Sequence, residues 1–149
     1  MSGFADHFSS QAADYARHRP RYPAALFDRL AELAPAADFA WEVGCGSGQA
    51  TAGLAARFER VLACDPSPAQ LERAPALANV EYAAMRAEDG GLAPASADLV
   101  LAAQAAHWFD MAAFAGQADR VLRPGGVLAL VGYGLPRVAP EIDAVIDAV

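Results

Sequence analysis

The sequence predicts an α/β fold in which a doubly wound, mostly parallel sheet carries helices on both faces. Short apolar segments alternate with helical patterns along the 149 residues, and the first of these segments runs directly into a turn with glycines at 44, 46 and 48. The run from Asp98 to Ala103 is typical of a central strand that is buried on both faces. Strand–helix alternation of this kind builds a parallel sheet with right-handed crossovers.

Two helices are expected around the glycine turn. The first should end before Pro35, because its apolar residues recur every three or four positions up to that point. These residues are Leu26, Phe27, Leu30, Leu33 and Ala34. The second helix begins near Gln49 and has four apolar positions. They are Ala52, Leu54, Ala55 and Phe58.

The remaining elements follow in the same alternation. A strand at Val61–Cys64 ends in Asp65, and the turn Pro66-Ser67-Pro68 leads into a short helix that holds Leu71. Three further strands are expected at 80–84, 98–103 and 127–131. The helix before the last strand covers 109–122 and stops at Pro124-Gly125-Gly126. Its inward-facing residues are Phe114, Ala118, Val121 and Leu122.

The glycine turn is the expected functional centre. Alternate glycines allow positive φ and a close approach of a ligand to the main chain, and the helix that follows offers unpaired amide N–H groups. Glu42 lies two residues before the first glycine, and Asp65 ends the next strand, where an acid can bind ribose hydroxyls. Strand, glycine turn, helix, strand and terminal acid together indicate a nucleoside-binding βαβ unit.

Composition narrows the partners. The net charge of −7 argues against nucleic-acid backbones and anionic membranes, both of which require clustered Lys and Arg. The two cysteines, Cys45 and Cys64, are expected to be small buried residues in a reducing cytoplasm. No signal peptide, membrane span or metal site is predicted, so the expected location is cytoplasmic.

Four stretches resemble one family, the class I S-adenosylmethionine-dependent methyltransferases. They are Glu42–Gly48, Ala87-Glu88, Gln104–Phe109 and Arg120–Gly126. Within that family, the chain is most similar to the small-molecule type 11 branch, which includes trans-aconitate-methyltransferase-like proteins. The resemblance covers about Phe4 to Tyr133 and implies a Rossmann-like sheet, S-adenosylmethionine as cofactor, S-adenosylhomocysteine as product and a small-molecule acceptor.

The resemblance also implies roles for individual residues. It places Glu42 near the amino group of the cofactor, Gly44 against its methionyl part and Asp65 on its ribose hydroxyls. It makes residues 1–22 an N-terminal lid, with Tyr15 and Arg19 over the cofactor, in front of a binding domain at 23–149. Further cofactor-binding candidates are Cys45, Gly46, Gly48, Pro66, Ala87, Glu88 and Gln104. Arg86 stands where the family commonly has an acid for the adenine amino group, and this departure bears on Ala87 and Glu88.

The stretch after the fourth strand carries the catalytic candidates. Strand order in a doubly wound fold places it at the ligand edge of the sheet. His107 could accept a proton or orient the acceptor, and Trp108 could exclude water or pack on the sulfonium on the substrate side.

Each of these assignments has a structural alternative. His107 and Trp108 could be a core histidine and a core tryptophan. Glu42 could pair with a backbone donor, Asp65 could cap a helix, and the N-terminal segment could be a solvated arm.

The resemblance leads us to expect that the sheet lacks the last two strands of the seven-stranded family sheet. The chain then reads as the N-terminal portion of a longer family member. An uncovered fifth strand would favour self-association. Two other functions stay open: a non-catalytic module that binds S-adenosylmethionine or another nucleoside, and a nicotinamide dehydrogenase. The dehydrogenase motif G-x-G-x-x-G fits poorly, because position 49 is Gln and the third glycine falls at 48.

Overall fold

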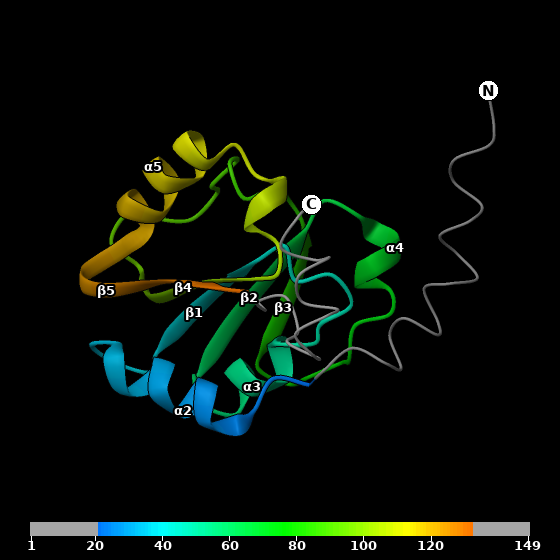
Figure 1. Cartoon of the computed structure of the whole chain (residues 1–149), viewed down its shortest axis with the longest axis horizontal. Coiled ribbons are helices and arrows are strands. Elements are labelled where there is room, and N and C mark those ends of the chain that lie inside the picture. Colours follow the sequence, from blue (N-terminus) through cyan, green and yellow to red (C-terminus); the bar gives the residue numbers. More distant parts are fainter. Residues whose placement is uncertain (1–20, 133–149) are drawn as a thin grey trace, which may run out of the picture.

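The computed structural model of the protein describes residues 21–132. Five parallel strands form one sheet in the order β3-β2-β1-β4-β5 (Figure 1). The strands are β1 (Phe39–Val43), β2 (Arg60–Asp65), β3 (Val80–Ala84), β4 (Ala97–Ala103) and β5 (Leu122–Val131). The helices are α2 (Ala24–Leu33), α3 (Thr51–Ala55), α4 (Pro68–Leu71), the 3-10 turn η1 (Ala106–Trp108) and α5 (Met111–Val121). The predicted α/β class and parallel sheet are confirmed.

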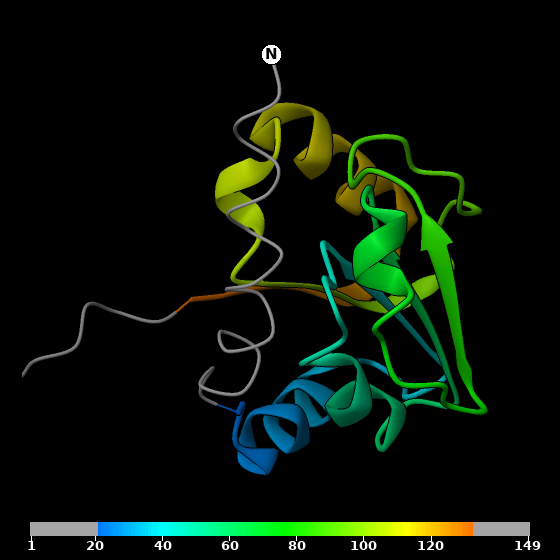
Figure 2. The same ribbon diagram turned by 90° about the vertical axis from the view of Figure 1, so that its right-hand side faces the viewer.

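The strand order places a topological switch between β1 and β4. The two strands pair directly, with Ala40 opposite Leu99 and Glu42 opposite Leu101. After β1 the chain continues into α3 on one face of the sheet, and after β4 it continues into α5 on the other (Figures 1 and 2). The connections diverge at the carboxyl ends of these strands, which is where ligands bind in open α/β sheets.

Side chains that alternate along the strands form a separate core on each face of the sheet. On the α5 face, Trp41 and Val100 pack with Phe114 of α5. On the α2 and α3 face, Ala40 and Leu99 belong to the second core. That core also contains Phe27, Leu30, Ala50, Leu54, Phe58, Val61 and Leu101. The predicted inward residues Phe114, Ala118 and Val121 are confirmed as buried.

Several predicted boundaries were wrong. Helix α5 ends at Val121 and β5 begins at Leu122, so the Pro124-Gly125-Gly126 segment lies inside the strand. The register shifts at this point, between Ala97 and Leu99 of the neighbouring strand, and β5 is at the sheet edge, where a proline with no N–H is tolerated. Leu33 was expected to face inward, but it is 48% exposed.

Helix α5 also begins later than predicted. It starts at Met111 because Asp110 is its N-cap, with Oδ1 accepting hydrogen bonds from the N–H groups of Ala112 and Ala113 at 3.1 Å each. The residues before it form the separate turn η1. The turn η1 carries His107.

A buried acid that the sequence reading grouped with the apolar run of β4 fixes the amino-terminal edge of the sheet. Asp98 is 0% exposed, and its Oδ2 accepts hydrogen bonds from the N–H groups of Asp38 (3.1 Å) and Phe39 (2.9 Å). Its Oδ1 lies 3.0 Å from Arg123 Nη1, an ion pair without hydrogen-bond geometry. Arg123 also donates to Ser96 O at 3.2 Å. One carboxylate therefore connects the starts of β1, β4 and β5.

A second arginine of the same segment holds a loop. Arg120 donates from Nη2 to Gly90 O at 2.7 Å and from Nη1 to Leu92 O at 2.8 Å. In the described structure, both arginines of the stretch Arg120–Gly126 thus stabilise the fold through hydrogen bonds or ion pairs.

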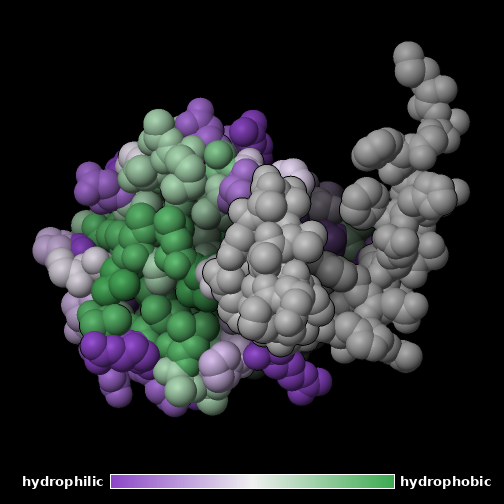
Figure 3. Space-filling view, in the orientation of Figure 1, coloured by the Kyte–Doolittle hydropathy of each residue, from purple (hydrophilic) through white to green (hydrophobic). Residues whose placement is uncertain are grey.

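The β5 strand leaves apolar side chains on the surface. Val127, Ala129 and Val131 pack toward the α2 and α3 face, whereas Leu128 and Leu130 are 40% and 50% exposed. Figure 3 shows hydrophobic residues gathered in the area where β5 runs.

Within residues 21–132, no helix has the length and apolar character needed to cross a bilayer.

Candidate functional site

The turn from β1 into α3 is built around three glycines with φ of 65° (Gly44), 56° (Gly46) and 85° (Gly48). They do not serve the same purpose. A Cβ on Gly44 would lie 2.6 Å from Ala105 Cβ, and one on Gly48 would lie 2.8 Å from Pro75 Cδ, whereas a Cβ on Gly46 would meet no atom within 4 Å. Gly44 and Gly48 are required by the packing of the turn. Among residues 21–132, no atom fills the space beside the Gly46 Cα, so this glycine leaves its main chain open to a ligand.

Asp65 is hydrogen-bonded to Gly46. Its half-buried carboxylate accepts a hydrogen bond from Gly46 N–H at 3.0 Å through Oδ2 and from Ser67 N–H at 2.8 Å through Oδ1. The N-cap residue of α4 is Ser67, and Asp65 closes the turn in front of that helix by accepting the Ser67 N–H. A carboxylate oxygen can accept two hydrogen bonds, so each oxygen retains capacity for a ligand hydroxyl.

Glu42 lies under the same turn, near the carboxyl end of β1. Its side chain is 1% exposed, and Oε2 accepts a hydrogen bond from Thr51 Oγ1 at 2.6 Å. Burial raises the pKa of Glu42 to about 7, and the hydrogen bond from Thr51 opposes that shift. Its protein partner is therefore a hydroxyl, not the backbone donor of the alternative, and no ion pair among residues 21–132 involves it.

The two cysteines beside the turn are structural in character. Both are free and buried, and Cys45 N–H donates to Cys64 O at 2.9 Å. Burial raises the pKa of the Cys64 thiol to about 11 and shifts the pKa of Cys45 upward as well. Neutral, buried thiols agree with the reading of these residues as small core residues.

The loop after β3 reaches the start of α5. Ala87 is 3% exposed and belongs to the core on the α5 face. Glu88 Oε1 accepts a hydrogen bond from Asp110 N–H at 2.8 Å, and its Oε2 lies 3.4 Å from Arg86 Nε. In the described structure, Glu88 therefore joins this loop to the segment that carries η1.

The segment after β4 covers the first glycine. Ala105 and Phe109 contact Gly44, and the Phe109 ring also packs on Phe114 at a centroid distance of 5.0 Å. Gln104 has a φ of 54°, an uncommon left-handed conformation for a residue with a side chain. Its N–H donates to Val131 O at 2.8 Å, and its buried Nε2 has no partner within residues 21–132.

His107 and Trp108 stand on the outer side of this segment. His107 is exposed, Trp108 is 81% exposed, and their rings lie 5.0 Å apart. The alternative that both are core residues is therefore wrong. His107 thus lies at the surface between Ala105 and Phe109, the two residues that pack on the glycine turn.

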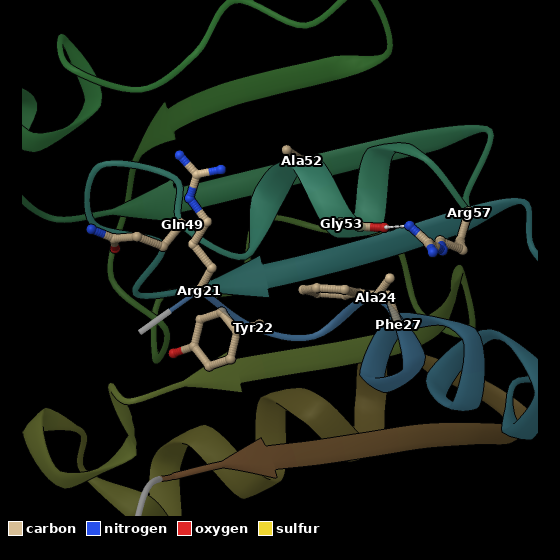
Figure 4. A pocket seen from close by; sticks show the side chains of 8 residues that line it. All are labelled: Arg21, Tyr22, Ala24, Phe27, Gln49, Ala52, Gly53 and Arg57. Atoms are coloured by element: carbon tan, nitrogen blue, oxygen red, sulfur yellow. Dashed lines mark hydrogen bonds between the residues drawn. The ribbon is translucent and has the colours of Figure 1, made fainter. Parts of the chain in front are cut away.

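A cavity of about 420 Å³ lies between α2 and α3 (Figure 4). It is lined by Arg21, Tyr22, Ala24, Phe27, Gln49, Ala52, Gly53 and Arg57. Arg57 is committed to neighbours, with Nη2 2.9 Å from Asp28 Oδ1 and Nη1 donating to Gly53 O at 3.5 Å. Within residues 21–132, none of the predicted site residues lines this cavity, and the glycine turn reaches it at Gln49. The predicted lid residues Tyr15 and Arg19 lie outside the described residues.

The structure thus gathers most of the predicted site at one edge of the sheet. Gly46 is hydrogen-bonded to Asp65, Glu42 is hydrogen-bonded to Thr51 just after the turn, and the Gln104–Phe109 segment packs against Gly44. The sequence reading missed Thr51 and Phe109 as site residues. The sequence signal for the first of them is a threonine just after the glycine turn, where the following helix begins.

Comparison with known proteins gives concordant matches. A family described as a methyltransferase domain matches residues 41–130. A Dictyostelium discoideum protein named as a methyltransferase is 39% identical over 142 residues, which cover 95% of this chain and 54% of that protein. A solved structure from Anaeromyxobacter dehalogenans, described as a type II methyltransferase, has a TM-score of 0.78 at 57% identity, over 87% of this chain and 55% of that chain.

A more distant structure shares the fold. Geranyl diphosphate C-methyltransferase from Streptomyces coelicolor, solved with S-adenosyl-L-homocysteine, has a TM-score of 0.63 at 19% identity, over 72% of this chain and 43% of that chain. The chain spans about half the length of the curated relatives that it matches.

Proposed function

This chain belongs to the class I S-adenosylmethionine-dependent methyltransferases, and from this premise we infer that it binds S-adenosylmethionine at the β1–α3 turn and transfers the methyl group to a small-molecule acceptor. The observation that carries the proposal is the open main chain at Gly46, with Asp65 bonded to its N–H at 3.0 Å and Glu42 buried beneath the same turn. Membership of the trans-aconitate-methyltransferase-like branch and a cytoplasmic location stay predictions.

The residues present fit the proposed cofactor. Asp65 is held by two backbone N–H groups and retains acceptor capacity for the two ribose hydroxyls. A buried carboxylate without a cationic partner is costly, and a ligand ammonium beside Glu42 would offset that cost. Gly44 and Cys45 precede Gly46 in the turn, and we propose that their main-chain atoms contact the methionyl part, since Ala105 and Phe109 fill the space where a Gly44 side chain would lie. Pro66, Ala87, Glu88 and Gln104 stay candidates for the surrounding contacts.

The chemistry asks little of the protein beyond positioning. The cofactor supplies a methyl group already activated by a sulfonium, which leaves as a neutral thioether when the acceptor bonds to the carbon. The protein must hold the acceptor about 3–3.5 Å from that carbon and keep water away. We assign His107 to the acceptor proton and Trp108 to the substrate side, because both stand on the turn that covers Gly44.

A binding module without turnover is the second candidate, because the chain spans about half the length of its relatives. Turnover separates the two functions. If the chain binds the cofactor tightly but forms no S-adenosylhomocysteine with any acceptor, the module is favoured and the transferase is rejected for this chain.

Binding itself is tested at Asp65. S-Adenosylmethionine and S-adenosylhomocysteine should raise the melting temperature of the protein, whereas NAD should not. Losing a hydrogen bond to a charged group costs about 1.5–3 kcal/mol, so Asp65→Ala should weaken S-adenosylhomocysteine binding by about 10- to 150-fold in calorimetry. Asp28→Ala is the control, because Asp28 lies on α2 and pairs with Arg57. Equal affinity of the Asp65→Ala and wild-type proteins would remove Asp65 from the site.

Self-association is proposed from the exposed edge of β5. An apolar edge strand invites pairing with another chain. We expect light scattering to show dimers or larger species, and Leu130→Lys to reduce their mass. Leu33→Lys, at a residue of similar exposure on α2, should change it little. A monomer by light scattering, with mass spectrometry confirming all 149 residues, would contradict this expectation.

A further inference from the structure

We propose that Thr51 is a positioning residue for Glu42, holding one carboxylate oxygen so that the other meets the ammonium of the cofactor, and that Glu42 releases a proton when this ammonium binds. The proposal rests on the proposed function. It concerns a residue that lies nine positions from Glu42 along the chain and whose hydroxyl also faces the Tyr82 hydroxyl.

The geometry assigns different tasks to the two oxygens of Glu42. Oε2 is 2.6 Å from Thr51 Oγ1, and Thr51 is itself 0% exposed. Oε1 accepts no hydrogen bond from residues 21–132, so it is the oxygen with acceptor capacity left for a ligand. The free oxygen is therefore the one that a ligand can reach. The paired oxygen fixes its direction.

The position of Thr51 makes this contact rigid. It is the first residue of α3, directly after the glycine turn, and a β-branched side chain has few χ1 rotamers in a helix. Glu42 is equally constrained, because it lies on the central strand β1 with β2 and β4 on either side. Both side chains are thus set by regular structure and not by a loop.

The electrostatic surroundings favour an uncharged Glu42 until a cation arrives. Burial raises the pKa of Glu42 to about 7 against the opposing hydrogen bond from Thr51, so its acid form is favoured relative to that of an exposed glutamate. The titratable groups nearest to it are acidic, namely the thiols of Cys45 and Cys64 and the phenol of Tyr82, with Asp65 at the end of β2. None of them can supply a positive charge. A bound ammonium favours the carboxylate, and the proton then leaves to solvent.

The first test measures proton release with S-adenosylhomocysteine as the probe. At pH 6.5 an amino group of pKa about 7.7–8.0 is almost fully protonated, so the ligand contributes little to the proton balance. Calorimetry in buffers of different ionisation enthalpy should show release of at least about half a proton by the wild-type protein. Glu42→Gln should abolish the release. Release that is absent in the wild type, or unchanged in Glu42→Gln, would overturn the proton linkage.

The second test separates positioning from structure. Thr51→Val removes the hydroxyl and should weaken S-adenosylhomocysteine binding about 10-fold or more at pH 6.5, whereas Thr51→Ser keeps the hydroxyl and should stay within a few fold of wild type. In a Glu42→Gln background, Thr51→Val should cause little further loss, because its effect acts through Glu42. Fully additive losses, or equal affinities of the Val and Ser variants, would reject the positioning role.

If Thr51→Val folds poorly, Thr51→Ala replaces it in the test. It should show the same loss of S-adenosylhomocysteine affinity and the same dependence on Glu42. The outcomes also distinguish the two proposals. Absence of binding by the wild-type protein rejects the proposed function itself, whereas wild-type binding that is independent of the Thr51 hydroxyl rejects this inference alone.

Discussion

Replacing Asp98 by alanine is expected to lower the free energy of unfolding by about 2–6 kcal/mol, because it leaves two backbone N–H groups at the start of β1 without their acceptor, at a cost of about 1–3 kcal/mol each. Asp98 is 0% exposed, and three groups depend on it: the N–H groups of Asp38 and Phe39 and the guanidinium of Arg123, whose side chain is 31% exposed. A loss of this size is a large fraction of the stability of a typical domain, which is about 5–15 kcal/mol.

Urea unfolding at pH 7 measures the effect, with two comparisons. Asp98→Asn retains an oxygen for the backbone N–H groups while losing the charge, so it should be more stable than Asp98→Ala. Glu32→Ala breaks the pair of Glu32 with Arg29, in which both side chains are 65% exposed, and should cost about 0.5 kcal/mol or less. If Asp98→Ala is too unstable to purify, the soluble yield of Asp98→Asn relative to Glu32→Ala carries the comparison. Equal stability of the Asp98 and Glu32 variants would show that the buried pair contributes nothing special.

Asp98 also marks the limit of what the sequence could predict about the fold. The five strands and their parallel arrangement could be predicted, because each strand coincides with a local apolar run. The role of Asp98 depends on which strand starts meet in space, and its partners at Asp38 and Phe39 are 60 and 59 residues away. A pattern of neighbouring residues cannot predict a contact between residues that are so far apart in the sequence. It therefore placed the acid in an apolar run without a reason for its burial.

The boundary between α5 and β5 failed for a different reason. Pro124-Gly125-Gly126 reads locally as a turn, and in a central strand it would interrupt the ladder. The structure accommodates it because β5 is at the edge of the sheet and the register with β4 shifts at the same place. Tertiary context overrode a correct local preference.

The site shows the same division. Glu42 and Asp65 could be identified from their positions beside the glycine turn, since the βαβ pattern is local. The different roles of the three glycines could not be predicted from the sequence. Position 44 must be glycine because Ala105, which follows the neighbouring strand β4, fills the space where a side chain would lie. The pairing of Glu42 with Thr51 needed the placement of α3 against β1.

His107→Ala is expected to lower turnover by about 10²–10⁴-fold, the range for loss of a general acid or base. Cofactor affinity should change little, because Asp65 and Glu42 supply the contacts proposed for the cofactor. The melting temperature should also stay near that of wild type, because His107 is exposed on η1 and its removal leaves no cavity. Turnover is measured as release of S-adenosylhomocysteine with an acceptor that the wild-type protein methylates.

The variant Trp108→Phe tests whether Trp108 acts through its aromatic ring or through its indole N–H. The indole is 81% exposed and lies beside the His107 ring, so a phenylalanine keeps an aromatic wall while removing the N–H donor. If Trp108 only shields the site, turnover of Trp108→Phe should stay close to wild type while Trp108→Ala loses activity. His107→Gln completes the set, because it retains hydrogen bonding without a titratable ring near neutral pH, and it should be as slow as His107→Ala. Full turnover by either His107 variant at normal stability would reject proton transfer by His107 and leave the turn as a cover for the cofactor.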